Sequence, residues 1–540
     1  MIMRYRLVSV VVWMLLPLFL SAATYYVDDR PINGTGTLND PFNNFDDALA
    51  AAQPGDTVAV LPGVYALNSA ISTVRDGTAT QRITIKAYDP NDRPVITRIG
   101  RVLGLGHRYI TVDGLIFNAE FADADVVRIY SGADHAILRN CEIKNSLRDG
   151  IDITGADSVL IENCEIHHLL AGSYTNQQDA HGIVASHQRH LVIRGCNIYY
   201  FSGDAFQTDP SRSAPLWDDV LIENCHLWTG PLPNDVAGWH QGEVPGENAV
   251  DTKIDPDSVS TGYRPRIVIR NVEAHGFVPG FISTRAPFNI KEQVECIIEN
   301  VKVYQNQVAF RLRGPGSRGG AHVTIINAIA YDNDIVFRTE DDIELLHIYN
   351  GTFDRPAGGQ YFQNVAGGYV QSGFELLNSL FMGSKPSDAT DPSNLAADTS
   401  FFVNAADHDY HLRAGSPAID AGVDIAAVTT DFEGNPRPAG HYDVGAFEYQ
   451  QPTGTEPSDP AVGSFFLYPN FPNPFNPVTN VEFRIGNPSQ GRDGSEWVTL
   501  KIYDSFGREV KTLVNGRLRG GRYTVQWDGT DAMGRPAASG

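Results

Sequence analysis

The sequence predicts an all-β protein in which a long solenoid of stacked β coils precedes a smaller β-rich module. A short strand motif with asparagine at a fixed place recurs along the middle of the chain, and turn formers are abundant, with 51 glycines and 32 prolines. At 540 residues the chain is too long for one compact core, so several domains or one elongated repeat are expected.

The N-terminus has the pattern of a secretory signal peptide. Arg4 and Arg6 precede the apolar run 7–20, and the small residues 21–23 then supply a cleavage site. Residues 1–23 are therefore predicted to be removed on export, and the mature protein to be secreted or held at the cell surface. No later stretch is apolar and long enough to cross a membrane.

The net charge of -23 argues against nucleic acid as a partner, because no basic stripe is present to neutralise phosphates. An acidic polymer would also be repelled unless its site carried cations or a bound metal ion.

The repeat is a short alternating strand that ends at an asparagine or a glycine. It reads ILRNCEI (137–143), LIENCEI (160–166), VIRGCNI (192–198), LIENCHL (221–227), VIRNVEA (268–274), IIENVKV (297–303) and TIINAIA (324–330). The fixed residue recurs at spacings of 23, 32, 29, 47, 29 and 27 residues, a period typical of β solenoids. Asparagine in such a turn can adopt a left-handed conformation and bond its counterpart in the next coil.

Four cysteines occupy the position after this turn residue. Although disulfides are common in exported proteins, stacking of the coils would place these side chains in one column, about one strand spacing apart. We therefore expect buried thiols rather than bridges at Cys141, Cys164, Cys196 and Cys225.

The segment before the repeat predicts a cap for the open end of the solenoid. It contains a short amphipathic helix around 42–52, followed by a Pro-Gly-Asp turn at 54–56 and the first strand. With the asparagine ladder, residues 24–395 resemble the pectin-lyase-like superfamily, which implies a right-handed parallel β-helix. That fold hosts lyases, hydrolases and proteins without activity, so the resemblance is more specific for fold than for function.

The strand repeat is replaced by other sequence motifs after residue 395. Residues 396–449, with SPAIDAG and DFEGNPRPAGHYDVGAFEY, resemble a closing module that follows such helices, and 450–463 is a Pro/Gly/Ser-rich linker. Residues 464–540, with YPNFPNPFNP, resemble the sorting module of the type IX secretion system. This resemblance implies an immunoglobulin-like sandwich that is truncated at Gly540 and has the secretion machinery as its partner.

A second strand in each coil predicts a groove. Aligning RDGIDIT (148–154), AHGIVAS (180–186), GDAFQTD (203–209), ENAVDTK (247–253) and QVAFRLR (307–313) gives two inward columns with outward columns between them. Lys253 lies in an outward column, with carboxylates one coil below and Arg311 and Arg313 about 10 Å above. The intervening coil is assigned to PGFISTR (279–285), which ends at Arg285.

The coil of Lys253 is the most expanded one, and long loops on a rigid scaffold commonly wall a binding cleft. Trp239 and Tyr263 in these loops are candidates to stack on sugar rings, although simple loop packing is the expected role of any single aromatic. The other candidate substrate contacts are Arg285, Gln207 and His181, and a structural role is the more usual one for such a histidine.

The lyases of this superfamily act by β-elimination on uronate polymers, and the groove offers residues for each role. Calcium would neutralise the substrate carboxylate, with Asp204, Asp209, Glu247 and Asp251 as its candidate ligands. Lys253 is the candidate base, and Arg311 or Arg313 would stabilise the carboxylate or the leaving oxygen. The resemblance thus implies a monomeric, calcium-dependent lyase of an acidic polysaccharide such as pectate or alginate.

Three alternatives stay open. Lys253 and its acidic neighbours can be ordinary paired surface residues, with the arginines covering apolar surface. A β-helix glycoside hydrolase would use Asp204, Asp209 and Asp251 as paired carboxylates without a metal. A polysaccharide-binding adhesin would need no such cluster, which is why an enzyme is preferred.

Overall fold

The structure is a computed structural model that describes residues 22–208, 217–255, 259, 261–316, 318–450, 465–467, 479–485, 495–503, 509–519 and 521–531. The chain divides into two compact units, Met1–Tyr449 and Gln450–Gly540, and each is described by itself. Strands are the main regular secondary structure of both, as the sequence predicts.

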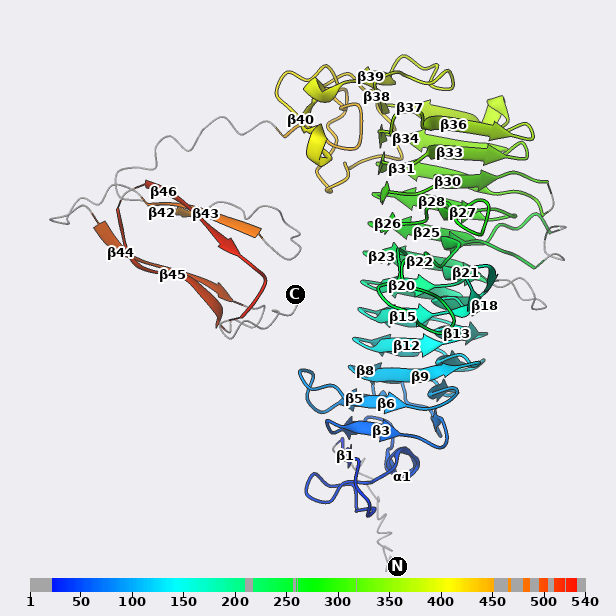
Figure 1. Cartoon of the computed structure of the whole chain (residues 1–540), viewed down its shortest axis with the longest axis vertical. Coiled ribbons are helices and arrows are strands. Elements are labelled where there is room, and N and C mark those ends of the chain that lie inside the picture. Colours follow the sequence, from blue (N-terminus) through cyan, green and yellow to red (C-terminus); the bar gives the residue numbers. More distant parts are fainter. Residues whose placement is uncertain are drawn as a thin grey trace, which may run out of the picture. The chain divides into compact units, whose positions relative to one another are not determined.

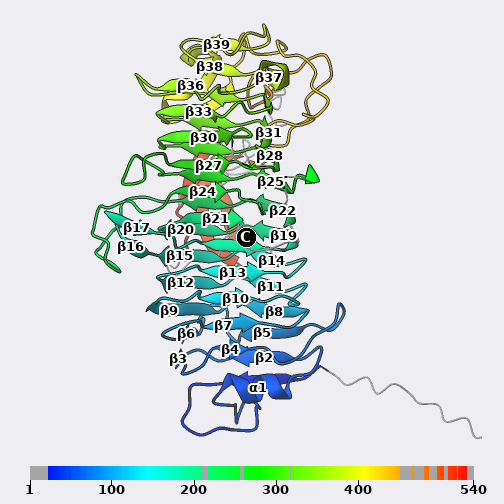
Figure 2. The ribbon, with the colours of Figure 1, turned by 90° about the vertical axis from the view of Figure 1, so that its right-hand side faces the viewer.

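The first unit is a parallel β-helix whose coils pass in turn through three long sheets (Figures 1 and 2). Sheet I consists of β1 (Thr24–Val27), β2 (Thr57–Val60), β5 (Ile83–Ala87), β8 (Ile110–Asp113), β11 (Ile137–Arg139), β14 (Leu160–Glu162), β19 (Arg189–Arg194), β22 (Asp218–Glu223), β25 (Arg266–Arg270), β28 (Glu295–Glu299), β31 (His322–Ile326), β34 (Leu345–Tyr349) and β37 (Phe374–Leu377). Sheet II consists of β3 (Val64–Ala66), β6 (Val95–Thr97), β9 (Ile116–Ala122), β12 (Glu142–Ser146), β15 (Glu165–Leu169), β20 (Asn197–Phe201), β23 (His226–Trp228), β26 (Glu273–His275), β29 (Lys302–Tyr304), β32 (Ile329–Tyr331), β35 (Thr352–Phe353), β38 (Leu380–Met382) and β39 (Leu395–Ala397). Sheet III consists of β4 (Ile71–Ser72), β7 (Leu103–Leu105), β10 (Val127–Ile129), β13 (Ile151–Thr154), β18 (Ile183–Ser186), β21 (Asp204–Thr208), β24 (Asn248–Asp251), β27 (Ala286–Ile290), β30 (Val308–Arg313), β33 (Ile335–Glu340) and β36 (Gln360–Val365).

The asparagine ladder forms as predicted. Asn271, Asn300 and Asn327 have φ of 53°, 53° and 51°, and each amide group bonds its counterpart in the previous coil. The Asn271 Nδ2 donates to Asn224 Oδ1 at 3.1 Å, Asn300 Nδ2 to Asn271 Oδ1 at 3.1 Å, and Asn327 Nδ2 to Asn300 Oδ1 at 3.0 Å. Gly195, with φ of 64°, fills the same position because glycine adopts this conformation without strain.

The cysteine column is also confirmed. The four predicted cysteines and Cys296 are buried free thiols, and the predicted four lie in one continuous apolar core with the inward residues of all three sheets. These thiols therefore act as small core side chains.

A short helix caps the N-terminal end of the solenoid. Helix α1 (Phe45–Ala51) is shorter than the predicted 42–52 and begins after Asn44, whose side chain accepts from the Asp47 N–H at 2.8 Å. Its apolar face, with Phe45, Ala48 and Leu49, is buried against the first coils.

The C-terminal end of the helix is closed by irregular chain with a small hairpin. This part contains η2 (Gln371–Gly373), η3 (Thr399–Phe401), η4 (Ala405–Asp407), β40 (Phe402–Asn404) and β41 (Asp409–Leu412), and β16 (Ala171–Ser173) and β17 (Asn176–Gln178) form a second hairpin earlier in the unit. Arg437 joins the closing segment to the solenoid, since its buried guanidinium donates to Glu448 Oε1 at 2.5 Å and to Asn327 Oδ1 at 3.0 Å.

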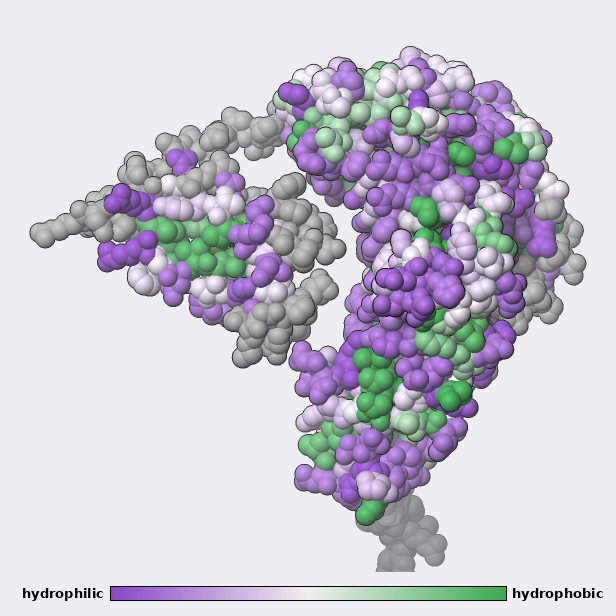
Figure 3. Space-filling view, in the orientation of Figure 1, coloured by the Kyte–Doolittle hydropathy of each residue, from purple (hydrophilic) through white to green (hydrophobic). Residues whose placement is uncertain are grey.

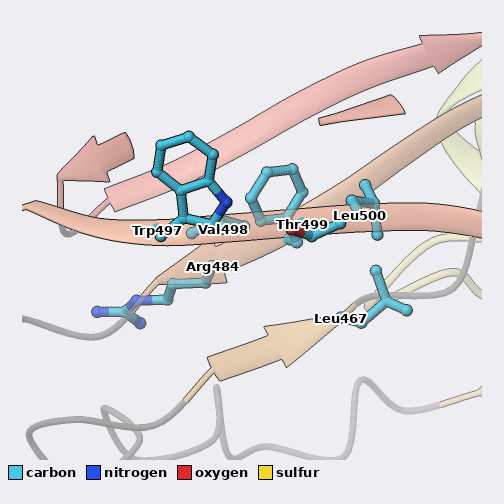
Figure 4. Close-up of a pocket in the computed structure, with 7 residues that line it drawn as sticks. Leu467, Arg484, Trp497, Val498, Thr499 and Leu500 are labelled. Carbon is cyan, nitrogen blue, oxygen red and sulfur yellow. The ribbon is translucent and has the colours of Figure 1, made fainter. Parts of the chain in front are cut away.

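The second unit contains a three-stranded and a two-stranded antiparallel sheet. These comprise β42 (Phe465–Leu467), β43 (Thr479–Ile485) and β46 (Gly521–Trp527), and β44 (Ser495–Tyr503) with β45 (Glu509–Arg519). Figure 3 shows apolar side chains gathered on one face of this unit, and Figure 4 shows a hollow there lined by Leu467, Trp497 and Leu500, among others. In the described parts of the chain, no helix has the length and apolar character needed to span a membrane.

Candidate functional site

The strands predicted to carry the site lie in sheet III (Figure 2), and their register is largely as predicted. In β18 and β21, Ile183 pairs with Phe206 and Val184 with Gln207. In β21 and β24, Phe206 pairs with Val250 and Gln207 with Asp251. Gln207 and Asp251 therefore share the outward column, as the alignment placed them.

Aromatic side chains pack under the next three strands of sheet III, β27, β30 and β33. Phe288, Phe310 and Phe337 point inward in successive coils and are fully buried. Their ring centroids are 5.6 and 5.3 Å apart, and the rings are stacked. Such close packing fixes the backbone from which the outward side chains project.

The backbone of Lys253 is held by buried polar groups in the coil below. The Lys253 N–H donates to Thr208 Oγ1 at 2.6 Å, and its carbonyl accepts from the Thr208 hydroxyl at 2.7 Å and from the Trp217 indole N–H at 2.8 Å. These contacts keep Lys253 in register after β24 has ended, so its ammonium group projects from a fixed point.

The ammonium group of Lys253 lies between Gln207 and Asp251. Its Nζ donates to Gln207 Oε1 and lies 3.5 Å from Asp251 Oδ2. The side chain is 24% exposed, so it is shielded from water but open to a ligand on one side. This places Gln207, a predicted substrate contact, directly on the candidate base.

A second lysine occupies the equivalent position in the next coil, and the sequence alignment missed it. Asp251 pairs with Asn289, so Lys291 stands above Lys253. Lys291 is held in the same way, because its N–H donates to Thr252 Oγ1 and its carbonyl accepts from that hydroxyl, both at 2.8 Å. Its Nζ lies 3.0 Å from Asp251 Oδ1.

The segment assigned to the intervening coil is therefore corrected. The strand there is β27, not 279–285, and Asn289-Ile290-Lys291 repeats the order of Asp251-Thr252-Lys253: a polar residue, a buried residue and a lysine. That repeat is the feature of the sequence from which Lys291 could have been predicted. Pro287 hides it, because proline inside a run of residues argues against a strand.

Four carboxyl groups, those of Asp179, Asp204, Glu247 and Asp251, lie around Lys253 and influence one another. Burial, with the neighbouring Asp204, Asp179 and Asp251, raises the pKa of Glu247 to about 8. Burial would lower the pKa of Lys253, but Asp251 and Asp204 outweigh it and the pKa is raised. Without a bound cation, the carboxylates thus hold the proton on Lys253.

Asp204 is fixed deep in this cluster. Its Oδ1 accepts from the N–H and the side-chain amide of Asn248 at 3.1 and 2.7 Å. Burial and the Asp251 carboxylate raise its pKa. The Asp204 N–H donates to His181 Nδ1 at 2.8 Å.

His181 therefore has a positioning role in this structure rather than the predicted contact with substrate. Its ring is 6% exposed, and burial lowers its pKa. Because Nδ1 accepts a hydrogen bond, the neutral imidazole carries its proton on Nε2.

The two predicted catalytic arginines are engaged elsewhere on sheet III. Arg311 Nε and Nη2 donate to Glu340 Oε1 and Oε2 at 2.9 and 3.2 Å, and Arg313 Nε lies 3.2 Å from Glu340 Oε2. Arg338 pairs with the same carboxylate. The three arginines form a cluster around Glu340 and do not point into the Lys253 cluster.

The remaining predicted contacts fall into three cases. Arg285 is 0% exposed and donates to the Val244 carbonyl at 2.9 Å. Trp239 is 1% exposed and packs in a small loop core with Leu170 and Leu232. Neither side chain therefore presents a surface to a ligand. Tyr263 is 48% exposed, and its hydroxyl donates to Asp218. Asp209 lies outside the described residues.

The donor set of the acidic cluster suits calcium, which binds carboxylate and amide oxygens. Asp204, Glu247 and Asp251 supply such oxygens, and burial together with their crowding raises the pKa of Glu247 to about 8 and also raises the pKa of Asp204. A bound cation would stabilise the ionised forms of these two carboxyl groups. Within the described residues, however, this cluster does not bring three ligand atoms within 4.8 Å of one another. The chemistry of the cluster therefore fits the ion, whereas its side chains pair with one another instead of forming a closed cage.

The fold and the site together define a pectin-lyase-like right-handed β-helix with a lysine–carboxylate groove. The family model of the Pel9A-like right-handed β-helix region matches residues 24–342, more than half of the chain, and the chain belongs to that family. The FlgD Ig-like domain model matches residues 485–540.

Solved structures with similar folds include three lyases at low identity. Pectate lyase Pel9A has a TM-score of 0.45 and 16% identity, over 80% of this chain and 98% of that one. A rhamnogalacturonan lyase gives 0.45 and 16%, over 66% and 87%. An alginate lyase from Paenibacillus sp. str. FPU-7 gives 0.38 and 15%, over 64% and 99%. A comparison with curated protein sequences gave no significant match.

Proposed function

We propose that this protein cleaves a uronate-containing polysaccharide by calcium-dependent β-elimination. The observation that carries the proposal is the fixed position of Lys253, whose backbone is held by Thr208 just after β24 and whose amine is shielded beside carboxyl groups. Membership in the Pel9A-like family supports it, since Pel9A itself is a pectate lyase.

The elimination needs a base for the proton next to the uronate carboxylate. Lys253 takes that proton on Nζ, and the electron pair of the broken C–H bond forms the double bond as the glycosidic oxygen leaves. Lys291, in the same position one coil along, supplies a fixed positive charge for the substrate carboxylate or the leaving oxygen. It takes the role that the sequence assigned to Arg311 or Arg313.

Calcium supports this role of Lys253 through charge balance. Asp204, Glu247 and Asp251 are the described residues that would hold the ion, and when bound it supplies positive charge that acidifies the proton beside the uronate carboxylate. The carboxylates that hold the pKa of Lys253 up lose that influence once their charge is compensated, so more of the lysine becomes the free base.

The place of action proposed is outside the cell. Its supports are the signal-peptide pattern of residues 1–23, most of which lie outside the described residues, and the resemblance of YPNFPNPFNP to a type IX sorting module. The match of residues 485–540 is to the FlgD Ig-like domain model. We propose that the protein acts there as a monomer.

The test is an ultraviolet assay for the unsaturated uronate product. Purified protein is offered pectate, alginate, chondroitin and rhamnogalacturonan, each with calcium and with excess chelator. Absorbance that rises with calcium and stops with chelator supports the proposal and identifies the substrate. Full activity in excess chelator would show that the reaction does not need calcium.

A glycoside hydrolase is the second candidate, and Glu247 favours it. A carboxyl group whose pKa lies at about 8 stays protonated at neutral pH and can serve as a general acid, with Asp251 as the second carboxyl group of the pair. New reducing ends without ultraviolet absorbance would select this candidate. Neither signal on any polymer would leave a polysaccharide-binding solenoid.

A further inference from the structure

A second cluster of chemistry-bearing side chains lies on the outer face of sheet II, on a different face of the solenoid from Lys253 (Figure 1). Strands β23 and β26 are paired so that His226 lies beside Glu273 and Trp228 beside His275. His226, Glu273 and His275 each place one ligand atom within 4.8 Å of the others, the one such group found in the described part of the chain.

The two imidazoles meet edge to edge. His226 Nε2 and His275 Nε2 are 2.9 Å apart, so both ring nitrogens point at the same small volume. Without a metal ion, this contact is a hydrogen bond in which the Nε2–H of one ring donates to the Nε2 lone pair of the other. Such convergence of two Nε2 atoms beside a carboxylate is the donor set of His₂Glu zinc sites.

Aromatic neighbours fix the orientation of these ligands. The His275 ring is stacked between Trp228, at 5.7 Å, and Tyr304, at 4.7 Å. The Tyr304 hydroxyl donates to Glu273 Oε1 at 2.5 Å. This hydrogen bond from a neighbouring coil resembles the outer-shell contacts that orient metal ligands.

Charge at the cluster has contributions of both signs. Burial lowers the pKa of His226 and lowers that of His275 to about 4, so both rings are neutral at pH 7, the form that binds metal. Glu273 favours a cation, whereas Lys302, beside it on β29, opposes one at both histidines.

We propose that His226, Glu273 and His275 form a site for a divalent transition-metal ion, with zinc as the expected occupant. Three ligands leave one position for water, and all three residues are partly exposed, so an ion can enter from solvent. Because the ligands come from two successive coils, the bound ion ties β23 to β26 and stabilises the folded solenoid. The site is independent of the lyase reaction.

The experiment uses untagged full-length protein, stripped of metal, and zinc chloride as the probe. Equilibrium dialysis measures stoichiometry and affinity, and cobalt(II) substitution adds a visible absorption band from a low-coordinate nitrogen–oxygen site. We expect one equivalent of zinc in the wild type. The affinity should fall by at least about tenfold in His275→Gln and in Glu273→Gln.

Two further variants keep the test decisive. His347→Gln removes a partly buried histidine from sheet I and should leave binding unchanged. Lys302→Gln removes the opposing charge and should tighten binding about two- to fivefold, a gain that damage to the fold cannot produce. Zinc affinity that is the same in wild type, His275→Gln and Lys302→Gln would overturn the proposal.

Discussion

At the scale of single residues, the position of a cation one coil above Lys253 decides how substrate is held. The alignment placed Arg311 and Arg313 in this role, whereas the structure places Lys291 beside Asp251 and ties the arginines to Glu340. The two assignments predict opposite results for a pair of matched substitutions.

Lys291→Gln should lower kcat/KM on the uronate polymer by about 10- to 100-fold, because a fixed charge next to the reacting carboxylate is lost. Arg311→Gln removes one of three arginines at Glu340 and should change kcat/KM by about twofold or less. Steady-state kinetics of both variants provide the measurement. If kcat/KM falls strongly in Arg311→Gln and not in Lys291→Gln, the role belongs to the arginines, as the sequence predicted.

Sequence reasoning found Lys253, Asp204 and Asp251 because alternation alone separates inward from outward positions. Lys291 was missed because Pro287 lies within β27, and a proline inside a run of residues argues against a strand. The burial of Trp239 could not be predicted, because its packing against Leu170 joins residues of different coils. Loop residues have no periodicity that fixes their direction.

At the scale of elements, the asparagine ladder ties the coils together. The turn motif predicted both the left-handed backbone and the bonds between coils, since a repeated turn in a solenoid can only stack on itself. The ladder therefore depends on two separable properties of asparagine, its backbone conformation and its amide group.

Substitutions at Asn300 separate these properties. Asn300→Ala loses the amide bonds to Asn271 and Asn327 and strains a backbone with φ of 53°, so it should destabilise the protein by about 2–3 kcal/mol. Asn300→Gly loses the same bonds without the strain and should cost about 1 kcal/mol less. Denaturant unfolding measures both, and an Ala variant as stable as the Gly variant would contradict this account.

The hairpin of β40 and β41 should respond to pH through His411. Burial opposes the charged ring, but Glu433 and Asp409 outweigh it and raise the pKa of His411 to about 9. Because the pKa in the unfolded chain is about 6.5, the stabilisation is complete below that pH and is lost as pH rises through 9. The wild-type Tm should therefore fall over this window more than that of His411→Gln, and equal slopes would exclude His411 as the cause.

At the scale of the whole molecule, the closing segment is joined to the solenoid through Arg437, which pairs with Glu448 inside the closing segment and donates a hydrogen bond to Asn327 of the solenoid. Arg437 contacts Glu448, the ladder residue Asn327 and the backbone carbonyls of Gly445 and Ala446. The closing module thus covers the ladder at the point where the coils would otherwise present unpaired groups.

Arg437→Met should destabilise the first unit by about 3–5 kcal/mol, because it leaves Glu448 buried without its partner. Adding Glu448→Gln to Arg437→Met should recover part of this loss. Thermal unfolding of the two variants is the measurement. A single variant with wild-type stability would show that the ion pair does not hold the closing segment in place.

The central claim is that one shielded lysine on a rigid coil performs the elimination. The measurement that tests it most directly is the rate of unsaturated uronate formation by Lys253→Gln, with Lys86→Gln as the control because Lys86 is exposed on β5. The account predicts a fall in kcat of about 10²- to 10⁴-fold for Lys253→Gln, with the fold intact by circular dichroism and Lys86→Gln unaffected. A folded Lys253→Gln variant that keeps wild-type turnover would contradict it.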